Sequence, residues 1–298
     1  MSLASTIVSE RRANGRAIAI MCVGVLCFVA NDAIAKWLTV HYAPIEIVFV
    51  RNLLALPMIV AIVLAAAGRA GLRTRHLGVH ALRGLLLAGG ACTFFLALES
   101  VPLAEATALF FAAPIFIAAL SVPLLGEHVG WRRWSAVIVG FAGVLIVVRP
   151  GAAAFEPASL FAVASALLYA GGMLAVRWLD RDESVWTMML YAVLFPALFT
   201  GLVVLPQWQM PELSHLPVFL SMAVFGTLGI TLTSHAFRLA PAAIVAPFDY
   251  TALIWATLLG WLFWSEIPGI WTYAGAAVII ASGIYIVIRE TRTAGRSG

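Results

Sequence analysis

The side chains of this sequence that could do chemistry stand singly inside apolar stretches. In "FVANDAIAKW" (28–37), Asn31, Asp32 and Lys36 interrupt a run of aliphatic and aromatic residues. Asp32 and Lys36 are four residues apart, a spacing that lets two opposite charges pair along one face of a helix. Alternatively, Asp32 or Asn31 binds the amine of a ligand, because polar side chains buried among apolar ones cluster at functional sites. The sequence leaves both interpretations open.

Two further stretches carry isolated charges of the same kind. Arg51 lies within "IVFVRNLLA" (47–55), where pairing with Asp32 or Glu46 is favoured over forked binding of a ligand carboxylate. Asp249 lies within "PFDYTALIWATLLGW" (247–261), deeper than a helix end requires, which makes it a candidate for proton coupling or amine binding. His235 is a second coupling candidate, although a lone histidine is more often an ordinary hydrogen-bond partner.

Aromatic and hydroxyl side chains near the middle of other apolar runs could line a cavity. Thr93, Phe94 and Phe95 occur together, and Tyr250 and Trp255 flank the face of Asp249. Two interruptions indicate where such a cavity would lie. Tyr169 precedes the pair Gly171–Gly172, which predicts either a local opening of its helix or a thinner helix beside a ligand. Pro114 predicts a kink in another helix.

The elements that must position these residues are membrane spans. The chain has 298 residues, 63% hydrophobic and 11% charged, with a mean hydropathy of +1.01, whereas a soluble domain has about 25% charged residues. The three cysteines lie in apolar runs, which argues against a disulfide framework or a metal site. Apolar runs of suitable length predict ten spans, at 17–38, 45–67, 79–100, 103–125, 131–148, 158–179, 185–205, 216–237, 242–264 and 270–288.

Basic residues predict the orientation of these spans. With a cytoplasmic N-terminus, 15 of the 18 Lys and Arg residues fall in inner segments and two at outer ends. This bias follows the positive-inside rule and predicts that both termini are cytoplasmic, in a bacterial-type inner membrane. The net charge of +4 is therefore a topology signal and does not indicate nucleic-acid binding.

The chain also repeats itself. Pro102 and Pro241, and likewise Glu127 and Glu266, are 139 residues apart, and "AKWL" (35–38) is echoed by "VRWL" (176–179). Each copy holds five spans, an odd number, so the copies must insert in opposite directions. The predicted organisation is a cytoplasmic segment (1–16), a first repeat (17–150), a second, inverted repeat (151–290) and a cytoplasmic tail (291–298).

Two matched stretches, "LLGEHVGWRRWSAVIVGFAGVLIV" and "LFWSEIPGIWTYAGAAVIIASGIYIV", resemble the EamA-type branch of the drug/metabolite transporter superfamily. The resemblance covers about residues 17–290, with one departure, Ser265 in place of the glycine of the first copy, Gly126. It implies a ten-helix secondary carrier in which helices 5 and 10 are peripheral, and it is closest to aromatic amino acid exporters. Glu127 and Glu266 match the signature but lie at helix boundaries, where capping explains them.

The sequence therefore predicts an all-α membrane transporter that works by alternating access around a mostly apolar cavity. The expected cargo is an amino acid with a large side chain, moved outward; other metabolites or drug-like cations are the alternative. No protease, esterase or P-loop motif supports an intramembrane enzyme or an ATP-driven pump, and no filter motif supports a channel. No cofactor or metal is expected, and the partners are the small-molecule substrate and membrane lipid, with monomer and homodimer both open. The predicted substrate-binding residues are Asn31, Asp32, Thr93, Phe94, Phe95, Tyr169, Asp249, Tyr250 and Trp255, and the coupling candidates are Asp249, Asp32 and His235.

Overall fold

A computed structural model describes residues 3–126, 131–152, 155–179 and 183–294, and within these ranges all regular structure is helical. Five short 3-10 segments, η1 (Gly68–Leu72), η2 (Val176–Trp178), η3 (Leu205–Gln207), η4 (Leu213–His215) and η5 (Ala246–Thr251), join or extend the α-helices. The α-helices are α1 (Leu3–Leu38), α2 (Pro44–Ala67), α3 (Leu77–Leu98), α4 (Leu103–Phe110), α5 (Ala113–Leu125), α6 (Trp131–Val148), α7 (Ser159–Ala175), α8 (Val185–Val204), α9 (Leu216–Leu239), α10 (Ala242–Val245), α11 (Ala252–Trp264) and α12 (Ile270–Ala294).

The predicted fold class, ten membrane helices in two inverted five-helix repeats, is confirmed. Seven described segments are long and apolar enough to cross a membrane, and α6 and α12 contain shorter apolar helices. The remaining span, the ninth in chain order, is the interrupted run 242–264, formed by α10, η5 and α11. The first and last helices extend further than predicted, from Leu3 and to Ala294. Hydropathy locates the part of a helix that lies in lipid, whereas helical geometry continues into polar residues of good helix propensity.

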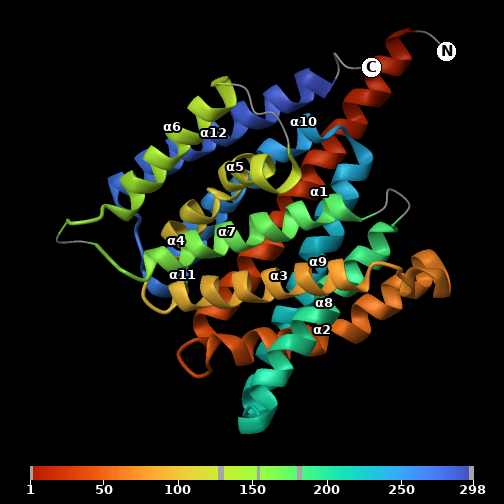
Figure 1. Ribbon diagram of the computed structural model, residues 1–298, viewed down its shortest axis with the longest axis vertical. Helices are drawn as coiled ribbons and strands as arrows, with labels where there is room; N and C mark the ends of the chain where they lie inside the picture. The colour runs from red at the N-terminus through yellow and green to blue at the C-terminus, as the bar shows by residue number, and fades with distance from the viewer. Residues whose placement is uncertain (1–2, 127–130, 153–154, 180–182, 295–298) are drawn as a thin grey trace.

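The packing of the helices follows the inverted repeat (Figure 1). The most extensive contacts join α1 to α9 and α3 to α7. In both contacts the first span of one repeat packs on the third span of the other, so exchanging the two repeats converts one contact into the other. The fifth helices, α6 and α12, pack on each other, as do the second helices, α2 and α8. Figure 1 shows α6 and α12 side by side at one edge of the molecule, the peripheral position that the family resemblance implies.

Small residues allow the peripheral pair to approach closely. A Cβ on Gly143 of α6 would lie 2.8 Å from Ile279 Cγ1 and 3.0 Å from the carbonyl oxygen of Gly275, both on α12. Nearby, the buried Ser282 hydroxyl donates a hydrogen bond of 2.6 Å to the Ala136 carbonyl oxygen. Helices in lipid associate through such close packing and interhelical hydrogen bonds, so α6 and α12 form a stable frame beside the remaining helices.

Two of the ten spans are broken, one in each repeat. The fourth span separates into α4 and α5 at Phe111–Ala112, just before Pro114, so the predicted kink is confirmed. The ninth span passes through the 3-10 segment η5, which contains Pro247 and therefore one residue without a backbone donor. A helix follows each break, α5 or α11, and the residue that caps its C-terminus is left-handed: Gly126 has φ 67° and Ser265 has φ 56°.

The predicted opening at Gly171–Gly172 was wrong. Helix α7 runs without interruption from Ser159 to Ala175. A Cβ on Gly171 or on Gly172 would lie 3.4 Å from Leu86 or 3.3 Å from Leu87 of α3, respectively. The two glycines therefore allow α3 and α7 to pack closely, the usual role of small residues at membrane helix interfaces.

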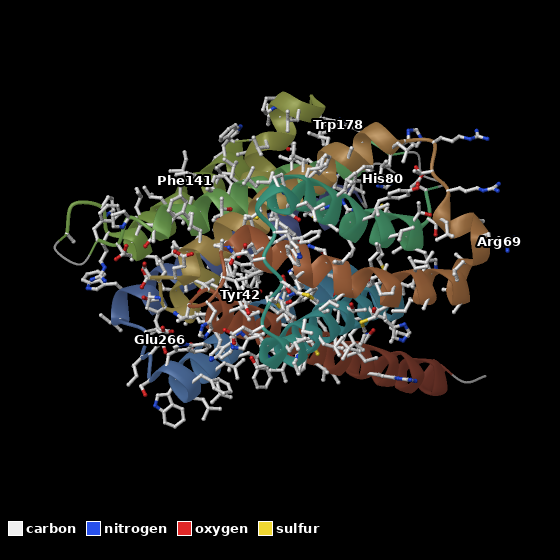
Figure 2. All side chains as sticks on the ribbon, turned by 90° about the horizontal axis from the view of Figure 1, so that it is seen from below. Tyr42, Arg69, His80, Phe141, Trp178 and Glu266 are labelled. Carbon is white, nitrogen blue, oxygen red and sulfur yellow. The ribbon has the colours of Figure 1, made fainter. Side chains whose placement is uncertain are left out.

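The two ends of the molecule differ in the residues that they carry. Both termini lie at the same end in Figure 1, as an even number of spans requires. In Figure 2, Arg69 and His80 lie toward the end that holds the N-terminus, and Glu266 lies at the opposite end. The termini end is called the inner end below, and the Glu266 end the outer end.

Candidate functional site

The two helix breaks face each other at matched positions of the repeats. The spacing of 139 residues holds from Pro102 and Pro241 onward, so Phe110 corresponds to Asp249 and Phe111 to Tyr250. The rings of Phe111 and Tyr250 are in edge-to-face contact, with centroids 5.0 Å apart. The point where the repeats meet is therefore also the point where regular helix is interrupted. Such interruptions expose backbone polar groups and mark binding sites in transporters built from inverted repeats.

Aromatic side chains from three helices surround this point. Phe110 of α4 contacts Phe94 of α3, with centroids 5.6 Å apart, and Tyr169 of α7 at 5.1 Å. Phe94 in turn lies 6.4 Å from Phe95, centroid to centroid. Phe94, Phe95, Tyr169 and Tyr250, named from the sequence, thus come together. Phe110 and Phe111 were missed, although the 139-residue spacing from Asp249 and Tyr250 could have indicated them.

Asp249 is exposed although it lies on η5, inside the ninth span. No hydrogen bond or ion pair to its carboxylate occurs among the described residues. Asp249 directly precedes Tyr250 of the aromatic cluster in the chain, and its carboxylate lies within electrostatic range of the Tyr169 and Tyr250 hydroxyls. An ionised side chain at membrane depth faces protein or water because lipid cannot solvate it. The Asp249 carboxylate is therefore expected to face water or a ligand and not lipid.

A second polar group lies in the outer half, where the predicted pairing was wrong. Lys36 does not contact Asp32; instead, Asp32 Oδ1 accepts a hydrogen bond of 3.0 Å from Asn31 Nδ2. Arg51 forms no ion pair with Asp32 or Glu46, and its guanidinium carbon lies 5.7 Å from the centroid of the Phe95 ring. Sequence spacing predicts contacts within one helix, whereas Lys36 and Arg51 contact residues of other elements.

Lys36 and Glu266 connect the outer ends of three helices. Lys36 Nζ lies 2.5 Å from Glu266 Oε1 and donates 2.8 Å to the carbonyl oxygen of Val101. The second oxygen of Glu266 accepts 3.0 Å from the Leu103 amide, the first residue of α4. Glu266 is thus a helix cap, as expected, but for α4 of the other repeat. We call Lys36, Val101, Leu103 and Glu266 the outer lock. Glu127, its counterpart in sequence, lies outside the described residues.

The remaining predicted residues differ in their surroundings. The Thr93 hydroxyl donates 2.8 Å to the Gly89 carbonyl oxygen of its own helix, so this hydroxyl is already used. Trp255 Nε1 is buried, and no partner for it occurs in the described part of the chain. His235 is exposed in the last turns of α9. The structure therefore brings Phe94, Phe95, Tyr169 and Tyr250 together and leaves His235 exposed near the inner end of α9.

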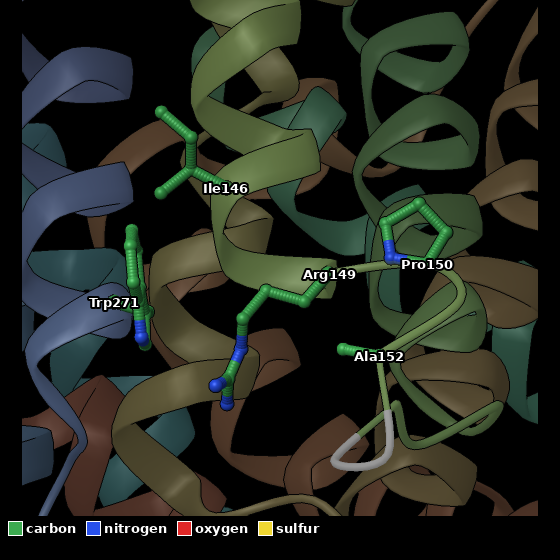
Figure 3. Close-up of a pocket in the computed structure, with 5 residues that line it drawn as sticks. All are labelled: Ile146, Arg149, Pro150, Ala152 and Trp271. Atoms are coloured by element: carbon green, nitrogen blue, oxygen red, sulfur yellow. The ribbon is translucent and has the colours of Figure 1, made fainter.

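Figure 3 shows a small open pocket that none of these residues lines. It is lined by Ile146, Arg149, Pro150, Ala152 and Trp271, where α6 ends and α12 begins. Because α6 and α12 form the peripheral pair, this pocket cannot connect the two faces of the membrane. The aromatic cluster at the helix breaks is the better candidate for a transport site.

Comparison with known proteins agrees with this architecture. Residues 15–149 and 157–289 each match the EamA-like transporter family. The chain belongs to this family. Because the match occurs twice and spans nearly the whole chain, the EamA-like domain is present as two copies, one in each half of the protein. An EamA-like chain of this kind is a small-molecule transporter and not an enzyme.

Several relatives carry names that state a cargo. An S-adenosylmethionine uptake transporter of Rickettsia bellii is 30% identical over 267 residues, covering 88% of this chain and 90% of the relative. A riboflavin transporter of Vibrio cholerae is 32% identical over 275 residues, covering 91% and 92%. A pseudopaline exporter of Pseudomonas aeruginosa is 27% identical over 261 residues, covering 86% and 90%. These EamA-like relatives differ both in cargo and in direction.

A protein of known crystal structure has the same fold. It is 20% identical, superposes with a TM-score of 0.58, and the match covers 94% of this chain and 99% of that protein. At this identity the likeness concerns the EamA-like fold alone.

Proposed function

We propose that this protein is a secondary carrier for a small metabolite that contains a planar ring, bound at the aromatic cluster where the two helix breaks meet. The observation that carries the proposal is the continuous set of ring contacts from Phe94 through Phe110 to Tyr169. Aromatic side chains bind flat ligands by offset stacking or edge contact, each pair adding about 0.5–1.5 kcal/mol. The ring-bearing cargoes named for two relatives, S-adenosylmethionine and riboflavin, support the same class.

Aromatic amino acids belong to this class as well, and their export is the narrower form of the proposal. Drug-like cations are the second form, since Asp249 places an unpaired carboxylate beside the rings. In either form, the site is reached alternately from the two faces as the repeats rock against each other. We place the protein in a bacterial-type inner membrane with cytoplasmic termini. The support is the excess of Lys and Arg at the inner end, which Arg69 illustrates in Figure 2.

The test is counterflow in proteoliposomes with purified protein. Labelled S-adenosylmethionine, riboflavin, tryptophan and threonine are offered separately to vesicles loaded with the same unlabelled compound. We expect saturable exchange for at least one ring-bearing compound and none for threonine. A carrier shows counterflow, a channel does not, and the recovered label is chemically unchanged.

A matched pair of variants links the exchange to the cluster. Tyr169→Ala removes a ring that contacts Phe110, whereas Phe161→Ala removes an exposed ring from the same helix, α7. We expect Tyr169→Ala to raise the half-saturating concentration about tenfold, since one ring contact and its buried area are lost. Phe161→Ala should leave it unchanged. Equal behaviour of the two variants, or exchange of threonine as fast as of the ring compounds, would place the site elsewhere.

A further inference from the structure

Two opposite charges in the outer half of the protein are left unneutralised by direct contact. Arg51 of α2 is half-buried, and no hydrogen bond or ion pair to its guanidinium occurs among the described residues. Asp32 of α1 is half-buried as well, and its one hydrogen bond comes from Asn31. The two charges lie within electrostatic range of each other but beyond ion-pair distance. Charges at membrane depth normally pair with one another, so a separated pair requires something polar between them.

Each of the two groups contacts a buried neighbour. The Arg51 guanidinium lies over the ring of Phe95, which is 2% exposed and therefore fixed in the core. Asn31, also 2% exposed, donates its amide hydrogen to Asp32, while its Oδ1 is buried without a partner in the described part of the chain. A Cβ on Gly226 of α9 would lie 3.2 Å from this oxygen, so the Asn31 amide packs closely against the α9 backbone. A buried amide oxygen without a hydrogen-bond partner lowers the stability of the fold. The hydrogen bond that Asn31 donates in return orients the Asp32 carboxylate.

We propose that Arg51 and Asp32 bind the two charges of an α-amino acid group on the substrate, Arg51 the carboxylate and Asp32 the ammonium. At 5.7 Å from the centroid of the Phe95 ring, the guanidinium is within range of a cation–π attraction. No described residue bonds to its N–H groups, which are therefore available for the forked contact that carboxylates prefer. Asp32 keeps acceptor capacity for an ammonium after accepting one hydrogen bond from Asn31. Asn31 acts as a positioning residue.

The group lies next to the aromatic cluster. The Arg51 guanidinium contacts the Phe95 ring. The Phe95 centroid lies 6.4 Å from that of Phe94, and the Phe94 centroid lies 5.6 Å from that of Phe110. An amino acid group held by Asp32 and Arg51 would therefore direct an attached ring toward the helix breaks. Among the cargoes named for the relatives above, S-adenosylmethionine has both an α-amino acid group and a planar ring, whereas riboflavin has only the ring system. The inference rests on the proposed function, and it narrows the cargo to ring-bearing amino acids and their derivatives.

The experiment compares ring-bearing ligands that have the complete amino acid group with ring-bearing ligands that lack part or all of it. Counterflow of labelled S-adenosylmethionine and labelled tryptophan is measured against unlabelled competitors: the parent compounds, decarboxylated S-adenosylmethionine, tryptamine, adenosine and riboflavin. We expect each parent compound to compete about 10- to 100-fold better than its decarboxylated form, the factor that corresponds to a charge-assisted hydrogen bond. Arg51→Gln should reduce this preference to about twofold, and Arg51→Lys should restore part of it. Arg69→Gln, an exposed arginine at the inner end, is the matched control and should keep the full preference.

The outcomes separate the two proposals. If ring-bearing compounds exchange but decarboxylated forms or riboflavin compete as well as the parent compounds, the amino acid clamp is refuted and the ring-binding carrier stands. If no ring-bearing compound exchanges, the carrier proposal itself fails and the clamp fails with it. Where Arg51→Gln does not fold, the ligand series on the wild-type protein decides alone. If the wild-type protein prefers the parent compounds, the amino acid clamp formed by Arg51 and Asp32 is supported. If the decarboxylated forms compete equally well, the clamp is refuted.

Discussion

The outer lock should determine how often the outer face opens, and Glu266→Gln tests this. Glu266 accepts from Lys36 through one oxygen and from the Leu103 amide through the other, so it connects α1, α4 and the end of α11. The side chains of Lys36 and Glu266 are 9% and 21% exposed. Opening the outer face requires these helix ends to separate, and the contacts would then be replaced by contacts with water. The lock therefore stabilises the outward-closed state relative to the outward-open one.

The size of the effect follows from the bonds that change. Glutamine keeps an acceptor for the Leu103 amide but loses the charge, so Lys36 retains the Val101 carbonyl oxygen at 2.8 Å as its remaining acceptor. A hydrogen bond to a charged group contributes about 1.5–3 kcal/mol and a neutral one about 0.5–1.5 kcal/mol, a difference of about 1–2 kcal/mol. That difference changes the ratio of outward-open to outward-closed molecules about 5- to 30-fold.

Cys92 provides a native reporter for this equilibrium. It lies in the outer half of α3, partly buried and within electrostatic range of Arg51. In a Cys22→Ala, Cys27→Ala background, a membrane-impermeant maleimide added at the outer face should label Cys92 about 5- to 30-fold faster in Glu266→Gln. Glu46→Gln is the matched control, because Glu46 caps only its own helix by accepting 3.1 Å from the Ala43 amide.

One result would refute the reasoning. If Glu266→Gln lowers the unfolding temperature while Cys92 is labelled at the wild-type rate, the lock holds the fold together in every state and does not gate the outer face. If Glu46→Gln accelerates labelling as much as Glu266→Gln, general loosening of the outer ends is responsible.

Three further predictions concern single positions. Asp249→Asn should abolish uptake driven by a pH gradient and preserve counterflow, since the variant keeps the shape of the site but cannot exchange a proton; transport assays with and without the gradient decide this. Gly143→Val should lower the free energy of unfolding by about 1–3 kcal/mol, because the valine side chain would overlap Ile279 and the Gly275 backbone of α12. Ser265→Gly should raise thermal stability by about 0.5–1 kcal/mol, because Ser265 has φ 56° and glycine adopts this conformation without a Cβ clash; an unchanged or lower unfolding temperature would contradict this.

Much of the scaffold could be predicted from the sequence because lipid allows few alternatives. Backbone polar groups in a membrane must be bonded within their own segment, so an apolar run of sufficient length is a helix. The 139-residue spacing then implies the exchange symmetry that pairs α1 with α9 and α3 with α7. Pro114 predicted one helix break because proline has no backbone N–H to donate to the helix.

The contacts of the candidate site could be predicted less well because they join residues far apart in sequence. Pairing of Lys36 with Asp32, four residues away, was one of two interpretations that the sequence left open, but the partner of Lys36 is Glu266, 230 residues away. Gly171 and Gly172 predicted a local opening of their helix, but the neighbouring side chains of α3 fill the space that the glycines leave. Local spacing carries no information on what the opposite helix presents at that level.

The inverted repeat gives the scaffold symmetry, but the polar groups at its centre are not symmetric. Asp249 has Phe110 at its matched position, and counting back from "AKWL" and "VRWL" gives Asp32 the counterpart Met173. Each of these two carboxylates therefore occurs once, on one side of the symmetry axis. Alternating access needs the two halves to exchange conformations, which favours similar packing in both. Recognition of an asymmetric substrate needs the opposite, because a symmetric site would bind it equally well in two orientations. Specificity in this protein should therefore be sought at positions where the repeats differ, and substitutions that make the copies alike at those positions should relax selectivity while leaving the fold intact.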